Sequence, residues 1–262
     1  MLCFHGGGGS PRSIERQSGF SRLSEREGFL VVYPKALAGN WNDGRDSQKI
    51  WCQANEIDDV AFVQSLLERL KSRFDIDEKR IYAAGFSNGA MFCLRLAREL
   101  PLAFAAVASV AGGMAESVSS AFSLDFPVSL LMIHGSKDPI VPYRGGGVGF
   151  HHNRGRVVDT HRCVRMWVKA NACNDDPQIS YLRDGRHDET KTKVFRFADG
   201  RASSEVILYT VIGAGHVWPG RRLGPRWRRM VGPVCLDFDA GEVIWSFFLT
   251  HPRKTAIRKK KG

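Results

Sequence analysis

The chain has 262 residues with an ordinary globular composition, 43% hydrophobic and 25% charged, and one domain of this length can bury a full core. It contains no run of about 18 apolar residues, the length needed to span a bilayer. Lysine and arginine total 38 against 27 acidic residues, a net charge of +11. This basic excess comes without an aromatic RNA-binding motif, a Cys/His finger spacing or a basic recognition helix. We therefore expect neither a membrane-spanning nor a nucleic-acid-binding protein.

Short apolar runs recur along the chain and predict the strands of one sheet. They lie at 1–5, 29–33, 80–84, 105–110, 129–134, 193–197 and 205–211. Several are continuous stretches of Val, Ile, Leu and Ala, which is typical of parallel strands buried on both faces. The glycine-rich stretch 143–156 predicts a mobile loop, and it lacks the Gly-Lys-Ser/Thr of a phosphate-binding loop.

Amphipathic segments alternate with these strands and predict helices at 58–71, 88–99 and 158–171. The first has apolar residues at helical spacing, and Pro101 ends the second. The last helix begins with a capping-box pattern at Asp239 and Glu242. The alternation predicts an α/β sheet with helices on both faces. We expect one catalytic domain over 1–252 and a disordered basic tail over 253–262.

The sequence Gly85-Phe86-Ser87-Asn88-Gly89 lies where a predicted strand gives way to a predicted helix. This is the context of a nucleophile elbow, in which a serine sits on a strained turn whose neighbours must lack side chains. The pentapeptide alone is a weak signal, and its place between strand and helix strengthens it. Ser87 is therefore expected to be an exposed nucleophile.

Two later residues could activate that serine. A serine hydroxyl needs a base to take its proton, and the base needs a carboxylate to hold its tautomer. Asp138 follows the predicted strand 129–134, and His216 follows 205–211. Active groups of open α/β sheets collect at the carboxyl ends of the strands. We therefore expect the hydroxyl, the imidazole and the carboxylate to meet at one edge of the sheet.

Backbone N–H groups for an oxyanion hole are also expected. The first predicted strand ends in His5 followed by four glycines, which let N–H groups approach a developing negative charge. Gly7 is the expected donor on this loop, with Gly8 as the alternative. The N–H of Asn88, at the start of a helix, is the expected second donor.

Other histidines and an early aspartate have structural interpretations. His5 and His134 both precede glycine at strand ends and are expected to support turns. The histidines at 151, 152 and 161 share no helix face with an acidic partner, so we expect no metal site. Asp43 precedes the nucleophile in the chain, against the expected order, and is interpreted as a turn residue.

Tryptophans and cysteines leave alternatives open. Trp218 either lines a substrate pocket or caps the core, and Trp41 is a second candidate for the pocket. Cys3 and Cys93 lie in apolar runs and are expected in the core. Disulfides stay open for four cysteines that the sequence alone does not pair: Cys52, Cys163, Cys173 and Cys235.

The chain resembles the polyhydroxybutyrate depolymerase and feruloyl esterase family of α/β hydrolases, over about residues 1–252. The resemblance rests on the motifs HGGGG, WNDGR, GFSNGAM, HGSKDPIVPY, GAGHVWPG and DFDAGEVIWSFF. It implies a mostly parallel sheet and an esterase with Ser87 as nucleophile, His216 as base and Asp138 as acid, without metal or organic cofactor. The substrates it implies are feruloyl or acetyl esters of polysaccharides, hydroxyalkanoate oligomers and small aryl esters.

The chain departs from that family at its start. Family members carry antiparallel strands before the HGGGG strand, often after a signal peptide, and neither is visible here. Without those strands, residues 29–33 would form an open sheet edge, through which a second copy could pair as a homodimer. The compartment is left open, although the family is often secreted.

Ester hydrolysis through an acyl-serine is the leading functional prediction. A peptidase or a thioesterase could use the same triad, and a non-catalytic binding protein could have the same fold, although it would not need all three residues. Five arginines after His216 predict either a preference for anionic substrates or a solvated basic surface: Arg221, Arg222, Arg226, Arg228 and Arg229.

Overall fold

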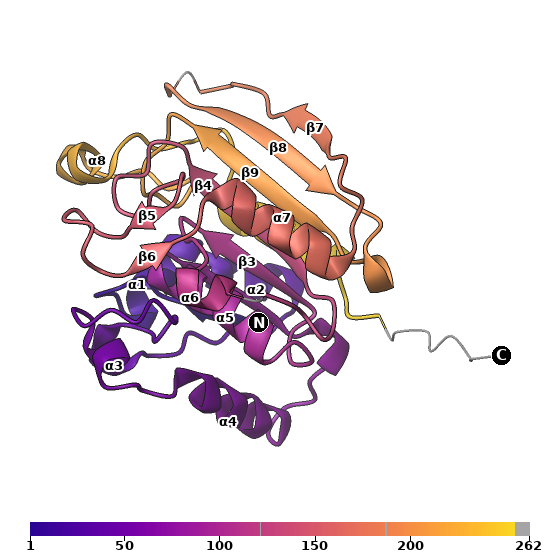
Figure 1. Ribbon diagram of the computed structural model, residues 1–262. Coiled ribbons are helices and arrows are strands. Elements are labelled where there is room, and N and C mark those ends of the chain that lie inside the picture. Colours follow the sequence, from indigo (N-terminus) through magenta and orange to yellow (C-terminus); the bar gives the residue numbers. More distant parts are fainter. Residues whose placement is uncertain (121, 187, 255–262) are drawn as a thin grey trace.

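A seven-stranded mixed sheet forms the centre of the molecule (Figure 1). The computed structural model describes residues 1–120, 122–186 and 188–254. The strand order is β1-β2-β3-β4-β9-β8-β7, and the five strands from β1 to β9 in that order are parallel. The strands are β1 Leu2–Phe4, β2 Tyr82–Phe86, β3 Ala106–Val110, β4 Ser129–Gly135, β7 Gln178–Tyr181, β8 Lys191–Phe197 and β9 Val206–Ile212.

Helices cover both faces of this sheet, as the sequence predicted. Apolar side chains of α4, α5 and α7 form the core on one face, and those of α1, α2 and α9 form the core on the other. Their bounds are α1 Pro11–Ser18, α2 Phe20–Glu27, α3 Trp51–Ala54, α4 Asp59–Lys71, α5 Asn88–Glu99, α6 Glu116–Ser119, α7 Thr160–Asn171, α8 Pro225–Val231 and α9 Ala240–Thr250. Short 3₁₀ turns lie at η1 Leu37–Gly39, η2 Glu78–Arg80 and η3 Arg201–Ser203.

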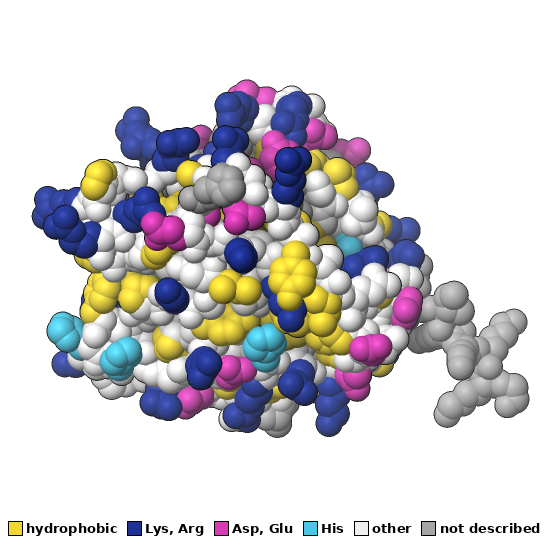
Figure 2. All heavy atoms as spheres, turned by 90° about the horizontal axis from the view of Figure 1, so that it is seen from above, with side chains coloured by type: hydrophobic (Ala, Val, Ile, Leu, Met, Phe, Trp, Pro, Cys, Tyr) yellow, Lys and Arg dark blue, Asp and Glu magenta, His cyan; other side chains and the backbone are white. Residues whose placement is uncertain are grey.

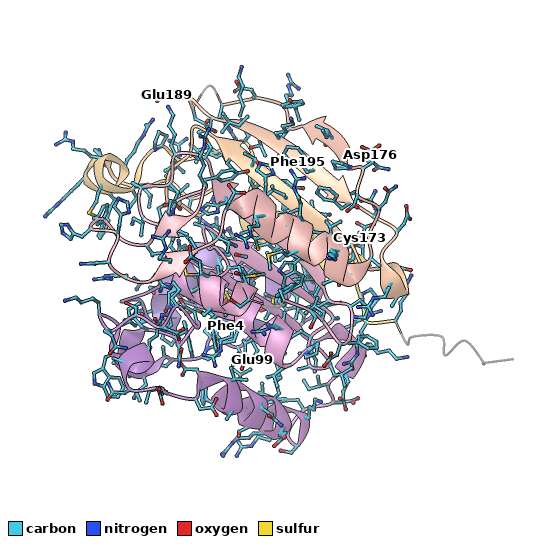
Figure 3. The ribbon with its side chains drawn as sticks, in the orientation of Figure 1. Phe4, Glu99, Cys173, Asp176, Glu189 and Phe195 are labelled. Atoms are coloured by element: carbon cyan, nitrogen blue, oxygen red, sulfur yellow. The ribbon has the colours of Figure 1, made fainter. Side chains whose placement is uncertain are left out.

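Three of the parallel strands, β1, β3 and β4, are buried along their whole length because helices pack on both of their faces. Every residue of β1, β3 and β4 is buried, which explains why these strands read as continuous apolar runs. Figure 3 shows Phe4 of β1 inside the molecule, where its ring meets Trp41 and Phe92 edge-on. This rigid layer positions the loops at the carboxyl ends of the strands.

The two antiparallel strands, β8 and β7, extend the sheet beyond β9. All four residues of β7 are exposed, including Ile179 and Tyr181. Figure 2 views the molecule from this side and shows hydrophobic side chains bordered by Lys and Arg. β7 was not among the predicted strands, because its alternating pattern, Gln-Ile-Ser-Tyr, is only four residues long and lies outside the longer apolar runs.

The predicted strand at 29–33 is reduced to one bridge. Val32 pairs with Leu2 beside β1, and the chain then leaves the sheet edge. Phe29 instead stacks on Trp245 of α9, with ring centroids 3.8 Å apart. Pairing of a second copy at this edge stays a prediction.

The glycine-rich stretch 143–156 has more structure than a plain loop. It contains β5 Gly146–Gly147, which pairs with β6 Arg156–Val157 in a short antiparallel ladder. Val148 and Val157 are buried and form a small cluster with Met91 of α5. The expectation of a mobile loop is therefore wrong in part, because Val148 within this stretch and Val157 directly after it anchor it to the core.

All six cysteines are buried free thiols. The disulfides left open for Cys52, Cys163, Cys173 and Cys235 do not form. Burial raises the pKa of Cys163 to about 12 and that of Cys173 to about 11. In the part of the chain that the structure describes, no helix combines the length and apolarity needed to cross a bilayer. The predicted tail at 253–262 falls largely outside the described residues.

Candidate active site

Ser87 lies on the sharp turn between β2 and α5. Its backbone angles are φ 55° and ψ −119°, a region that non-glycine residues rarely adopt and that marks stored strain. The turn is possible because Gly85 and Gly89 lack side chains. A Cβ on Gly85 would overlap the backbone of Gly89, and one on Gly89 would overlap the carbonyl groups of Phe4 and His5. The helix start therefore packs directly on the ends of β1 and β2.

His216 and Asp138 lie beside this turn, on loops that follow β9 and β4. The Nε2 atom of His216 is 2.9 Å from Ser87 Oγ. Its Nδ1 atom is 2.8 Å from Asp138 Oδ2. In sequence, His216 lies 129 residues after Ser87 and 78 residues after Asp138. The hydroxyl, the imidazole and the carboxylate thus form a continuous hydrogen-bonded chain.

Asp138 is held as a carboxylate by the groups around it. Burial alone would raise its pKa, but the charge of His216 and hydrogen bonds from His134 and His216 lower it well below the ordinary value. The Oδ1 atom also accepts the N–H groups of Ile140 and Val141, both at 2.8 Å. A buried carboxylate with this many donors keeps a fixed orientation and stays charged.

His134 is a supporting residue that sequence reasoning assigned only to a turn. It is buried, and its Nε2 lies 3.0 Å from the carbonyl oxygen of Val141 and 3.4 Å from Asp138 Oδ2. Its Nδ1 lies 3.1 Å from the hydroxyl of Thr160 at the start of α7. The histidine therefore links the Asp138 turn to α7.

Two backbone N–H groups lie next to the serine without an acceptor. The N–H of Asn88 opens α5, where the first turn of a helix leaves its donors unpaired. The N–H of Gly7 has no hydrogen-bond acceptor among the described residues, whereas Gly8 donates its N–H to Gly39. A Cβ on Gly7 would lie 3.7 Å from that of Asn88. The structure thus favours Gly7 over Gly8, and the oxyanion role of the pair stays a prediction.

The side chain of Asn88 ties the serine turn to the segment 41–45. Its Oδ1 accepts the N–H of Trp41, and its Nδ2 donates to Trp41 O and to Asp43 Oδ2 at 2.9 and 2.6 Å. Asp43 is fully buried and also pairs with Arg45 at 2.9 Å and accepts from Gln53. Sequence reasoning missed this network, because side-chain contacts between distant loops leave no local pattern.

The two tryptophans that were candidates for the pocket have different positions. Trp218 lines the cleft beside Ser87 and His216 and is also buried, and its contact with a substrate stays a prediction. Trp41 is fully buried and is absent from the cleft lining. Its ring packs on Phe92, and its indole N–H donates to His5 O at 3.1 Å. Trp41 therefore supports the loop that follows β1 from the protein interior, and it does not line the cleft.

A cleft of about 830 Å³ opens in front of Ser87. Gly6, Gly7, Asn88 and His216 line it together with the serine. This size lies within the 300–1,000 Å³ typical of small-molecule sites. The cleft therefore leads from the surface to the hydrogen-bonded chain of side chains.

One group of possible metal ligands lies elsewhere. Asp188, Cys235 and Asp237 place their ligand atoms within 4.8 Å of one another. Both carboxylates already accept backbone N–H groups, Asp188 from Leu236 and Asp237 from Gly185 and Arg186. These contacts fix two loops to each other. The predicted absence of a metal at His151, His152 and His161 stays a prediction.

Comparisons with known proteins give matches over most of the chain. A family model described as phospholipase/carboxylesterase matches residues 41–149. NocK of Nocardia uniformis subsp. tsuyamanensis is 28% identical over 95% of this chain and 73% of its own length. Poly(3-hydroxyalkanoate) depolymerase C of Paucimonas lemoignei is 26% identical, over 77% of this chain and 51% of its own. Feruloyl esterase B of Piromyces equi is 24% identical, over 86% of this chain and 40% of its own length.

A solved acetyl xylan esterase from Aspergillus awamori shares the architecture. It matches with a TM-score of 0.57 and 17% identity over 87% of this chain and 86% of that structure. The chain has the α/β-hydrolase fold. The predicted resemblance to depolymerases and feruloyl esterases is confirmed, and the relatives agree with the predicted class, carboxylic ester hydrolysis. The chain spans about half of the depolymerase and less than half of the feruloyl esterase.

Proposed function

We propose that this α/β hydrolase is a serine esterase that works through an acyl-enzyme at Ser87. The observation that carries the proposal is the unbroken chain from Ser87 Oγ through His216 to Asp138, with contacts of 2.9 and 2.8 Å. Its geometry matches the arrangement by which a base activates a serine and a carboxylate orients that base.

The proposed first half-reaction forms the acyl-enzyme. His216 Nε2 takes the proton from Ser87 Oγ as the oxygen attacks the ester carbonyl. Asp138 accepts the hydrogen bond from Nδ1–H and stabilises the resulting imidazolium. The N–H groups of Gly7 and Asn88 donate to the oxyanion, and each such donor typically contributes about 2.7–4 kcal/mol. The alcohol then leaves with the proton from His216.

The second half-reaction hydrolyses the acyl group from Ser87. His216 takes a proton from water, which attacks the acyl carbon, and returns that proton to Ser87 Oγ as the acid leaves. The proposed substrates are feruloyl or acetyl esters of polysaccharides, or hydroxyalkanoate oligomers, by analogy with the relatives' names.

Replacing the serine tests the mechanism. We expect Ser87→Ala to lower kcat/KM on p-nitrophenyl acetate and on methyl ferulate at least about 10⁴-fold, because attack by the hydroxyl is lost. Ser123→Ala is the matched control, since Ser123 is exposed and outside the cleft. Intact-mass spectrometry after a fluorophosphonate should show one adduct on the parent protein and on the control variant, and none on Ser87→Ala.

The alternatives predict different profiles in the same assay. A thioesterase would prefer an acetyl thioester over the matched oxygen ester. A peptidase would cleave an amide bond, such as that of the anilide matched to p-nitrophenyl acetate. A binding protein would turn over none of these and form no adduct. An undiminished rate in Ser87→Ala would contradict the proposal directly.

A further inference from the structure

The charged residues that line the cleft are all basic. Besides histidines, they are Arg16, Arg45, Arg154, Arg221 and Arg222, and no described lining residue is Asp or Glu. A cleft with charge of one sign and low-dielectric walls concentrates ligands of the opposite sign. The chemistry of each arginine decides whether its charge is available for this purpose.

Two of these arginines are already neutralised. Arg45 forms a buried ion pair with Asp43 at 2.9 Å. Arg221 pairs with Asp239 at 3.0 Å and donates to the carbonyl oxygens of Gln17 and Ser18. Arg221 thereby ties the end of α1 to the loop that follows His216. Both residues fix the walls of the cleft and leave no free charge for a ligand.

The other three arginines have no such partners. The side chains of Arg16, Arg154 and Arg222 are exposed, and none forms an ion pair or a hydrogen bond with a described residue. They come from three separate segments: α1, the loop before β6, and the loop after His216. The Arg221 tie joins the segments of Arg16 and Arg222 into one wall. Three cations without a described partner therefore line a cleft whose described lining residues include no carboxylate.

The mouth of the same cleft is apolar. Trp227 and Met230 of α8 line it and are 59% and 43% exposed. Phe150, on a separate loop, also lines it and is 52% exposed. Exposed aromatic side chains rimmed by charges are typical of a binding surface. The lining thus suits a molecule with an apolar body and an anionic group.

We propose that the cleft selects esters that carry a carboxylate on an apolar body, and that Arg16, Arg154 and Arg222 determine this selectivity. The proposal deepens the esterase function and rests on it. It differs from the sequence-based hypothesis on Arg221–Arg229, because Arg221 is tied to Asp239 and the arginines of α8 do not line the cleft. The carboxylate could belong to the acyl part or to the alcohol part of the ester.

Two pairs of matched esters distinguish these cases. Monomethyl terephthalate against methyl 4-carbamoylbenzoate places the charge on the acyl part. 4-Acetoxybenzoate against 4-acetoxybenzamide places it on the alcohol part. Each kcat/KM is divided by the rate constant for hydrolysis of the same ester by hydroxide, which corrects for intrinsic reactivity. At low salt we expect this normalised value to be on the order of tenfold higher for the anionic ester in at least one pair. The preference should shrink with added NaCl, because the three guanidinium groups are exposed and screened.

A charge-matched pair of triple variants locates the effect. In Arg16→Gln/Arg154→Gln/Arg222→Gln the ratio of anionic to neutral kcat/KM should fall to about one, because no unpaired charge stays on the cleft wall. Arg12→Gln/Arg226→Gln/Arg229→Gln removes the same charge from exposed positions outside the cleft and should keep the parent ratio.

Several outcomes would overturn the proposal. The first is a ratio of anionic to neutral kcat/KM near one for the parent in both ester pairs, although the neutral esters are turned over. The second is a control variant that loses the preference as much as the cleft variant does. The third is a preference that added salt does not change. If the cleft variant fails to fold, the three single variants and the salt series on the parent decide. Failure of the esterase function itself would be separate: the neutral esters would then not depend on Ser87.

Discussion

Single residues account for the electrostatics of the proposed site. Asp138 receives two backbone N–H groups and lies against two imidazoles. The sequence predicted Ser87, Asp138 and His216 because each follows a strand that could be recognised. It could not predict His134 or the side chain of Asn88 as partners, because their contacts depend on which loops meet in space.

The lowered pKa of Asp138 predicts a specific dependence of stability on pH. The folded pKa lies below the ordinary value of 3.8, so as pH falls the unfolded chain binds the proton first. The stability that the carboxylate contributes is therefore present above about pH 4 and is lost as pH falls toward the folded pKa. Asn at this position cannot take up that proton.

Urea unfolding from pH 5 to pH 3 measures the difference between the parent and Asp138→Asn. Below about pH 3.8 the parent's free energy of unfolding should fall more steeply, by up to about 1.4 kcal/mol per pH unit. All other carboxylates are common to both proteins and cancel in the comparison. Parallel curves would mean that the folded protein does not hold this carboxylate charged.

Elements with a buried apolar face were predicted well, and the others were not. The strands β2, β3, β4, β8 and β9 and the helices α4, α5, α7 and α9 agree with the sequence prediction to within a few residues. The short helices α1 and α2, together with the exposed strand β7, were missed. In α1 the signals are local: a Ser10–Ser13 capping box with Pro11 in the first turn. The helix has only eight residues, too few for an apolar periodicity to be detected.

The packing of α5 on β1 predicts the effect of one methyl group. Ala at position 89 would push α5 away from the carbonyl groups of Phe4 and His5, and overpacking of this kind typically costs about 1–3 kcal/mol, sometimes more. We expect Gly89→Ala to lower the free energy of unfolding by at least that amount and to lower esterase activity with it.

Gly224→Ala is the control for this substitution. A Cβ there meets no atom within 4 Å, and φ is −62°, so the change should cost no more than about 1 kcal/mol, the usual preference for Gly over Ala at a helix N-cap. Both free energies can be measured by urea unfolding followed by circular dichroism. Equal stability of the two variants would contradict the close approach of helix and strand.

At the scale of the whole molecule, the sequence predicted the class of fold but not how distant loops are joined. The buried Asp43–Arg45 pair reaches Asn88 at the serine turn, Gln53 on α3 and the carbonyl oxygen of Arg154. From the sequence, Asp43 is expected only to support a local turn. Its wider role depends on contacts between three segments that are distant in sequence, and no hydrophobic pattern along the chain predicts such contacts.

Breaking this pair should destabilise the molecule more than removing it. Asp43→Ala leaves the guanidinium of Arg45 buried without its partner, which typically costs about 3–5 kcal/mol. Asp43→Leu/Arg45→Met replaces both charges and should recover a large part of that loss. Asp176→Ala, at an exposed position near β7 (Figure 3), is the control and should change the free energy of unfolding by less than about 0.5 kcal/mol. A double variant no more stable than Asp43→Ala would contradict this account.

The long sequence separation within the proposed triad has a consequence for biosynthesis. The serine and the aspartate leave the ribosome well before the histidine, which follows the serine by 129 positions, and β9 must then insert beside β4 to bring the imidazole into place. A nascent polypeptide that ends before this strand lacks the proposed general base for Ser87. Turnover should therefore begin only after His216 has left the ribosome and β9 has joined the sheet beside β4.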